Sequence, residues 1–115
     1  MRSGSTLVEA LVALVLFQIG VLALAATTAT AARDLGVANR HSRAQAVAEH
    51  RVALLRAGAC PSPTAGIREL PGGLTERWRI RASGAMRAIS DSVVFPGACG
   101  RPSSVVARGF TLCAE

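Results

Sequence analysis

A single carboxylate, Glu9, stands at the start of a long apolar run near the N-terminus. From Ala10 to Ala32 the sequence has no charged side chain. A helix over these positions would be roughly 35 Å long, enough to cross a bilayer core of about 30 Å. A carboxylate at the bilayer centre costs on the order of 2–3 kcal/mol, and less near the interface. We therefore expect Glu9 either to lie at the headgroup level or a helix N-terminus, or to have a cationic partner.

The residues around Glu9 form a longer pattern. A short leader containing Arg2 ends at Gly4, and the residues Ser5, Thr6, Leu7, Val8 and Glu9 run directly into the apolar segment. This stretch resembles the N-terminal segment of type IV pilins and type II secretion pseudopilins, most closely their minor members. The resemblance covers about the first 30 residues of the chain. The family usually has phenylalanine or methionine where Ser5 stands.

The resemblance implies how the chain would be processed and assembled. A prepilin peptidase would cut after Gly4, leaving Ser5 as the new N-terminus and the site of N-methylation. The chain would then be a single-pass inner-membrane protein with a periplasmic head, and would join other pilin or pseudopilin subunits in a filament. Glu9 would there meet the free N-terminal amine of a neighbouring subunit. Since removing one partner of a buried ion pair costs about 3–5 kcal/mol, Glu9 would set the register between subunits.

A secretory signal peptide is an alternative interpretation of the same segment. Ala23, Leu24 and Ala25 place small residues at the spacing that signal peptidase favours. Cleavage after Ala25 would release a small secreted domain. Against it, Glu9 would lie inside the apolar region, and the basic region before it would contain only Arg2 and the amine.

Nucleic-acid binding is the other alternative, because the formal net charge is +6 and every basic residue is arginine. Arginine without lysine, together with abundant alanine and glycine, indicates a compositional bias more than a binding surface. Arg77, Arg79 and Arg81 alternate with Trp78, Ile80 and Ala82. On a strand this places the arginines opposite the aromatic side chain, so the pattern favours a solvent-facing ladder over a nucleic-acid platform.

Basic residues also bear on membrane orientation. Arg33, Arg40, Arg43 and Arg51 all follow the apolar run, and the positive-inside rule would place that side in the cytoplasm. The cysteines and the family resemblance point to the periplasm, and we follow them.

Three cysteines, Cys60, Cys99 and Cys113, lie in the second half of the chain. None belongs to a Cys-x-x-Cys pair and no histidine lies near them, so a zinc site is disfavoured. Two of the three are expected to form a disulfide in an oxidising compartment, and the sequence leaves open which pair closes. Cys60 follows the expected helix, where a disulfide to the sheet would fix how the helix leaves the head.

No catalytic pattern stands out. Two histidines, His41 and His50, are interpreted as solvated helix positions, and the carboxylates are scattered. The sequence has no glycine-rich phosphate loop, metal-ligand cluster or nucleophile elbow. We expect no enzyme activity, no cofactor and no metal.

The remaining pattern predicts an α+β fold. Beyond Ala32, apolar residues recur at helical spacing at Leu35, Ala38, Ala44, Val47, Ala48, Leu54 and Leu55. The expected organisation is a leader over 1–4, a helix over 5–57 with residues 10–32 transmembrane, a connecting loop over 58–73 and a small head over 74–115. The head would be an antiparallel sheet of about three strands, near residues 77–82, 87–95 and 104–113, packed on the second half of the helix.

Overall fold

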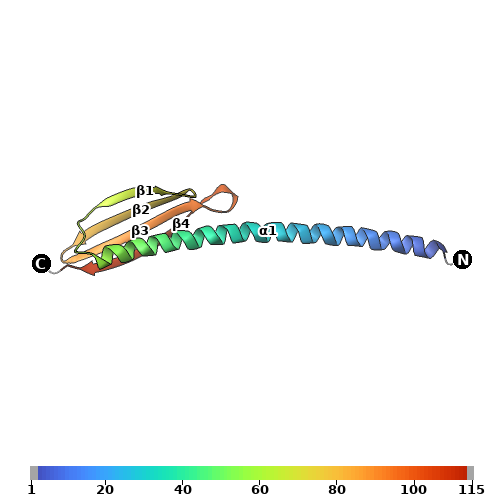
Figure 1. The fold of residues 1–115 in the computed structure, drawn as a ribbon, viewed down its shortest axis with the longest axis horizontal. Helices are drawn as coiled ribbons and strands as arrows, with labels where there is room; N and C mark the ends of the chain where they lie inside the picture. The colour runs from blue at the N-terminus through green and yellow to red at the C-terminus, as the bar shows by residue number, and fades with distance from the viewer. Residues whose placement is uncertain (1–2, 114–115) are drawn as a thin grey trace. The chain divides into compact units, whose positions relative to one another are not determined.

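The computed structural model describes residues 3–113, and the side chains of residues 6–113. One long helix, α1, runs from Ser3 to Ala57 (Figure 1). The chain divides into two compact units, with the boundary between Leu35 and Gly36. The first unit contains the apolar part of α1. The second contains the rest of α1 and a β-sheet.

The sheet has four strands: β1 (Ala65–Leu70), β2 (Leu74–Ser83), β3 (Met86–Pro96) and β4 (Pro102–Leu112). They are antiparallel and follow one another in the order β1-β2-β3-β4, so every strand pairs with the next one along the chain (Figure 1). The α+β fold is therefore confirmed. The expectation of about three strands was wrong, because residues 65–70 form β1 inside the stretch expected to be a loop.

The strand ends are set by turns with left-handed backbone. Gly72 and Gly73 follow Pro71 between β1 and β2, and both have positive φ, at 88° and 73°. Gly84, with φ at 57°, lies in the turn between Ser83 and Met86, which are paired across β2 and β3. Glycine reaches this conformation without the steric cost of a Cβ atom, so these positions favour tight reversals.

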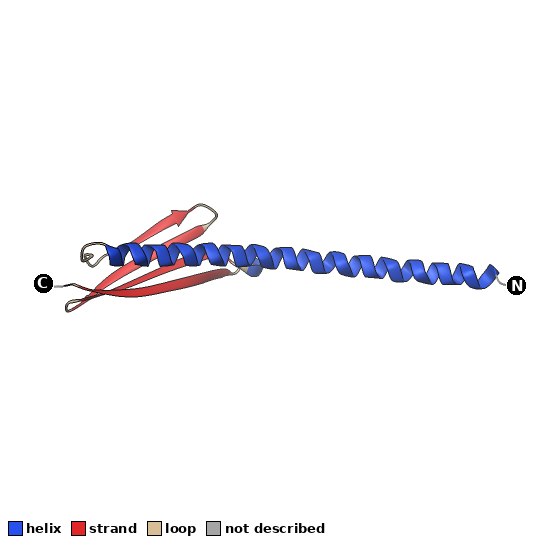
Figure 2. Ribbon diagram, turned by 60° about the horizontal axis from the view of Figure 1, so that its bottom comes forward, coloured by secondary structure: helices blue, strands red, loops and turns tan. Residues whose placement is uncertain are grey.

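Residues 36–57 of α1 cover one face of the sheet (Figure 2). Ala44 and Ala48 are fully buried and form a cluster with Leu74, Val93 and Phe95. A second cluster joins Val52 to Ile80 and Ile89. The small alanine side chains let the helix lie close to the larger residues of the sheet, and the apolar contact stabilises the unit.

The helix face that packs on the sheet differs in part from the predicted one. Ala44, Val47, Ala48 and Leu55 lie in or against the clusters as predicted, and Val52 joins them. Leu35, Ala38 and Leu54 are exposed. The contact follows positions 44, 48, 52 and 55, which a 3.6-residue period places on one stripe.

Two glycines allow close approach on this face. A Cβ atom on Gly109 of β4 would lie 2.6 Å from Val52 Cγ1 and 3.1 Å from Arg56 Cδ. A Cβ atom on Gly66 of β1 would overlap the indole ring of Trp78. Gly109 thus lets α1 cross β4, and Gly66 gives the only tryptophan of the chain its place on the sheet.

Candidate assembly site

The N-terminal unit has a surface that is apolar on all sides. Its large apolar side chains are exposed, with Leu22 at 71% and Val21 at 48%. By length and composition, α1 could cross a membrane, and none of its most apolar window is buried inside the molecule. A helix that is apolar all round is stable only when lipid or other protein covers it.

Three of the four threonines of this unit are compatible with such a covering. Thr27, Thr28 and Thr30 each donate a side-chain hydrogen bond to the carbonyl three residues earlier, over 2.8–2.9 Å. Their hydroxyl groups are therefore satisfied within the helix and need no water. The helix α1 runs through them without a break.

The predicted processing residues lie at the start of the same helix. Gly4 and Ser5 are in the first turn of α1, and residues 1 and 2 of the expected leader lie outside the described residues. Glu9 is exposed, and no cation of the described chain pairs with it.

A disulfide joins Cys60 to Cys113, with Cα atoms 5.5 Å apart. Cys60 lies three residues after the end of α1, and Cys113 directly follows β4. The prediction that two cysteines pair, and that Cys60 ties the helix exit to the sheet, is confirmed. Cys99 is free and exposed in the turn between β3 and β4.

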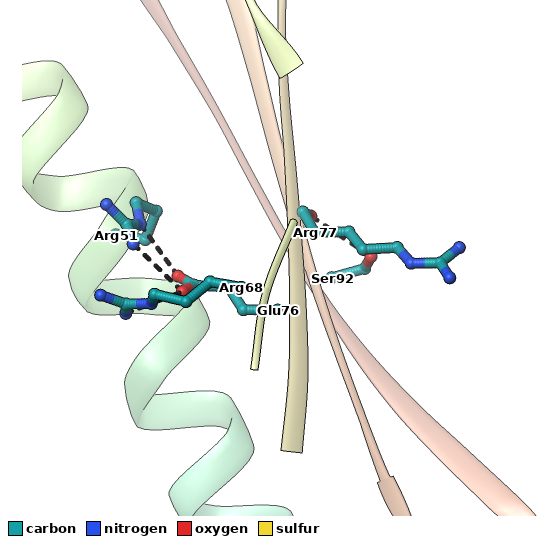
Figure 3. A network of polar contacts seen from close by, with 5 residues as sticks. All are labelled: Arg51, Arg68, Glu76, Arg77 and Ser92. Atoms are coloured by element: carbon teal, nitrogen blue, oxygen red, sulfur yellow. Dashed lines mark hydrogen bonds and ion pairs between the residues drawn. The ribbon is translucent and has the colours of Figure 1, made fainter. Parts of the chain in front are cut away.

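The alternating strand is confirmed as β2, and its arginines are solvent-facing. Arg77, Arg79 and Arg81 are exposed, whereas Ile80 is buried and Trp78 half-buried on the helix side. Ala82 is exposed near the end of the strand, beyond the part that α1 covers. Figure 3 shows Arg77 pointing away from α1, on the opposite side of β2 from Glu76.

Under α1 the sheet buries an ion-pair network that the sequence did not reveal. Glu76 is fully buried, and Arg51 of α1 donates to both its carboxylate oxygens, over 2.9 and 3.1 Å (Figure 3). Arg68 of β1 also binds Glu76, with Nη2 2.8 Å from Oε2. The guanidinium of Arg51 lies 4.7 Å from the ring centre of Trp78, a cation–π distance. One carboxylate thus connects α1, β1 and β2.

These contacts change the acidity of the pair. The hydrogen bonds from Arg51 lower the pKa of Glu76 below its usual value, against the opposing effect of burial. The same bond raises the pKa of Arg51. Glu76 is therefore ionised at neutral pH, and the network is a true salt bridge.

Asp91 of β3 is a second buried carboxyl on the same face. It is fully buried, and neither of its oxygens has a hydrogen-bond partner among the described residues. Burial and, after it, the nearby Glu76 carboxylate raise the pKa of Asp91 to about 7, with Arg51 opposing. Glu76 and Asp91 both lie beside Arg51, but the pKa of Glu76 is lowered and the pKa of Asp91 is raised.

Potential metal ligands are scattered over the described residues. No group of three or more histidine, cysteine, aspartate and glutamate side chains comes together within them. His41 is exposed on α1, with its ring against the edge of Phe95 at 5.9 Å between centroids, and His50 is exposed. The features that remain for function are the apolar helix with Glu9, the stapled head and the outer face of the sheet.

Sequence reasoning missed Glu76 and Arg51, although a signal for them exists. Extending the inward set Trp78 and Ile80 backwards by two residues places Glu76 on the helix side. Arg51 lies three residues after Ala48, on the same helix stripe. A charge of each sign on two facing apolar stripes indicates a buried pair.

Comparisons with protein-family models, with curated proteins and with solved structures found no match.

Proposed function

We propose that the chain is a minor pilin or pseudopilin subunit. It is inserted in the inner membrane by residues 10–32, cut after Gly4 by a prepilin peptidase, and assembled through its N-terminal helix into a type IV pilus or a type II secretion pseudopilus. Its head then lies in the periplasm or on the cell surface. The protein acts by assembly rather than by catalysis.

The observation that carries this proposal is the start of α1. The helix starts with Gly4, the link from Ser5 to Val8 and the lone carboxylate of Glu9. The next 23 positions, from Ala10 to Ala32, carry no charge. The side chains of that stretch are exposed along the whole helix unit. Such a helix needs an apolar environment, and a bilayer followed by a bundle of like helices supplies one at each stage.

The structure of the second unit is compatible with an exported head. A domain of this size has few large apolar side chains. The Cys60–Cys113 disulfide compensates for this, because it joins the residues before and after the strands into one covalent loop. Disulfides of this kind persist in oxidising compartments such as the periplasm.

The N-terminal residue of the mature chain, measured by mass spectrometry after expression in its own host, tests the proposal. A chain that begins at Ser5, with or without a methyl group, supports it. Replacing Gly4 by alanine, Gly4→Ala, should then leave an uncut chain in the membrane. A start at Ala26 would instead identify a secreted domain, and an intact Met1 a plain membrane anchor; either result rejects the pilin proposal.

A DNA-binding pilin is the second candidate, favoured by the exposed arginines of β2. The sheet face that carries these arginines also has exposed apolar side chains, such as Ile67 and Phe110, which make no favourable contact with phosphate groups. Salt-dependent binding of duplex DNA by the full chain in detergent, lost in Arg79→Glu, would establish this candidate. Binding that is absent at low salt would remove it.

A further inference from the structure

The sheet face opposite α1 has an unusual combination of side chains. We call it the arginine face, and define it by Arg77, Arg79, Arg81, Arg108, Ile67 and Phe110. These residues come from β1, β2 and β4, and cross-strand pairing places them on one side of the sheet. They line a groove of about 880 Å³. Nothing in residues 36–113 covers this groove, since α1 lies on the other face.

The arginine face concentrates the positive charge of four arginines. None of its arginines has an ion-pair partner within the described part of the chain. Asp91 is the only acidic residue among those that line the groove, and its carboxyl is fully buried beside Glu76 and Arg51. Glu69 lies beyond the end of the groove, where it accepts a hydrogen bond from Thr75. The face therefore attracts a negatively charged partner.

Apolar side chains are interleaved with these charges. Ile67 and Phe110 are each 63% exposed. Arg77 is paired with Ile67 across β1 and β2, and Arg81 lies in the same cross-strand row as Phe110, with Ala88 between them. Protein interfaces are enriched in arginine and aromatic side chains, which is the composition seen here. Single-stranded nucleic acid needs several aromatic rings on which to stack. Phe110 is the one aromatic side chain among the six residues that define this face, because the ring of Trp78, which also borders the groove, packs against Arg51 on the helix side. The composition favours a protein partner over a nucleic acid.

The second unit of another copy, over residues 36–113, does not have the complementary surface. Residues 36–113 contain eleven arginines and only four carboxylates. Two of the four, Glu76 and Asp91, are fully buried. The other two, Glu49 on α1 and Glu69 on β1, lie on separate elements. Like charges facing each other would oppose self-association through the arginine face.

We propose that the arginine face is the docking site for a different protein, whose contact surface combines carboxylates with apolar side chains. The carboxylates pair with Arg77, Arg79, Arg81 and Arg108, and the apolar side chains cover Ile67 and Phe110. Arginine suits this arrangement because its planar guanidinium binds carboxylates in a bidentate manner and also packs on apolar groups. This inference is independent of N-terminal processing, because a chain left uncut after Gly4 has the same face.

Site-specific photo-cross-linking of the full chain in its own host tests the proposal. A benzophenone amino acid replaces Ala88, which is exposed in the groove between Arg81 and Phe110. A second chain carries the same group at Ala46, exposed on α1, as the control for non-specific contact. We expect the first chain alone to form a cross-link to one different protein, at a segment with carboxylates next to apolar residues, identified by mass spectrometry.

Charge reversal then separates specific docking from general attraction. Arg79→Glu or Arg108→Glu should reduce the cross-link at least about tenfold, whereas Arg101→Glu, an equal change of charge outside the groove, should leave it nearly unchanged. Reversing the partner's carboxylates to arginine should restore the cross-link of Arg79→Glu. Fluorescence of Trp78, on the other side of β2, verifies that each variant is folded.

A cross-link from Ala88 to a second copy of this chain, to nucleic acid or to lipid would overturn the proposal. The absence of any cross-link from Ala88 would overturn it as well. If Arg101→Glu reduces the cross-link as much as Arg79→Glu does, the proposal is also overturned, because the attraction would then depend on net charge alone. Finding an uncut N-terminus together with the expected cross-link would reject the pilin proposal and leave this one in place.

Discussion

Residues 6–35 and residues 36–57 belong to one helix but have opposite surroundings. In the first part, leucines such as Leu22 are mostly exposed, and none of the most apolar stretch is buried. In the second part, Ala44, Ala48 and Val52 are buried against β2 and β3. Burial of apolar surface contributes roughly 25 cal/mol per Å². The chain itself supplies that contribution only to the second part, so the first part has to gain it from lipid or from other helices.

The two parts also differ in how they are held. The second part is fixed by a disulfide, a buried ion pair and two apolar clusters. The first part has only its own backbone and the hydroxyl bonds of its threonines. A perturbation should therefore affect one part and spare the other, and substitutions can test this separation.

The largest effect is expected from removal of the disulfide. Replacing Cys60 and Cys113 by serine should lower the free energy of unfolding of the head by about 4 kcal/mol, on the chain-entropy account of a loop of this length. Urea unfolding followed by Trp78 fluorescence measures the loss. Cys99→Ser, which changes a free exposed thiol, is the control and should have little effect. If the free energy of unfolding falls by less than about 1 kcal/mol in the double variant, the stability of the head does not depend on the disulfide.

The second prediction compares two exposed leucines of the same helix. Leu22 is 71% exposed and Leu54 is 55% exposed, but only Leu22 lies in the apolar part. Leu22→Asp should raise the free energy of membrane insertion by about 3 kcal/mol, because aspartate is costly at the centre of a bilayer. Leu54→Asp should leave insertion unchanged. Extraction of the full chain from membranes by urea measures the difference, and equal behaviour of the two variants would contradict a membrane role for residues 10–32.

A smaller effect is expected inside the head. Glu76→Gln leaves Arg51 and Arg68 without their shared carboxylate and should lower the stability of the head by about 2–3 kcal/mol, since both arginines keep some contact with water. Thermal unfolding followed by Trp78 fluorescence provides the measurement. Glu49→Gln removes an exposed carboxylate of α1 and is the matched control, expected to be within about 0.5 kcal/mol of the native chain. Equal stability of the two variants would mean that the network is not structural.

The smallest effect concerns pH. The folded-state pKa of Asp91, about 7, lies above the ordinary 3.8, so the folded state binds the proton more tightly. Stability therefore falls as pH rises from about 5 to 7, by about 1–2 kcal/mol. The lowered pKa of Glu76 acts in the opposite direction, but only below its ordinary value of 4.5. Asp91→Asn should remove the slope between pH 5 and 7 and raise stability at pH 7 and above. A slope that persists in Asp91→Asn would assign it to another group.

Much of the fold followed from local pattern. Gly58 and Pro61 indicated the end of the helix, and α1 does end at Ala57. Trp78 and Ile80 alternating with arginines indicated β2, and Ser83-Gly84 indicated its turn. These features depend on neighbouring residues, so the sequence carries them directly.

What could not be predicted depends on tertiary contacts. β1 was taken for a loop because its inward positions hold Gly66 and Arg68 in place of apolar residues. Gly66 is small to accommodate Trp78, and Arg68 points inward to reach Glu76. Asp91 is likewise buried by tertiary contacts, next to Glu76 of β2 and Arg51 of α1. The disulfide pairing was open because the register of β4 decides which cysteine meets Cys60.

The Cys60–Cys113 bond has a consequence for proteolysis. Every strand pairs with its immediate neighbour in sequence, and the disulfide spans all four, joining cysteines 53 positions apart in the sequence. A protease that cuts once in any of the turns between the strands opens a ring instead of releasing a fragment. The nicked protein keeps its mass under oxidising conditions and separates into two pieces only with a reductant. Damage to an exposed turn in a protease-rich compartment therefore need not remove a strand from the sheet.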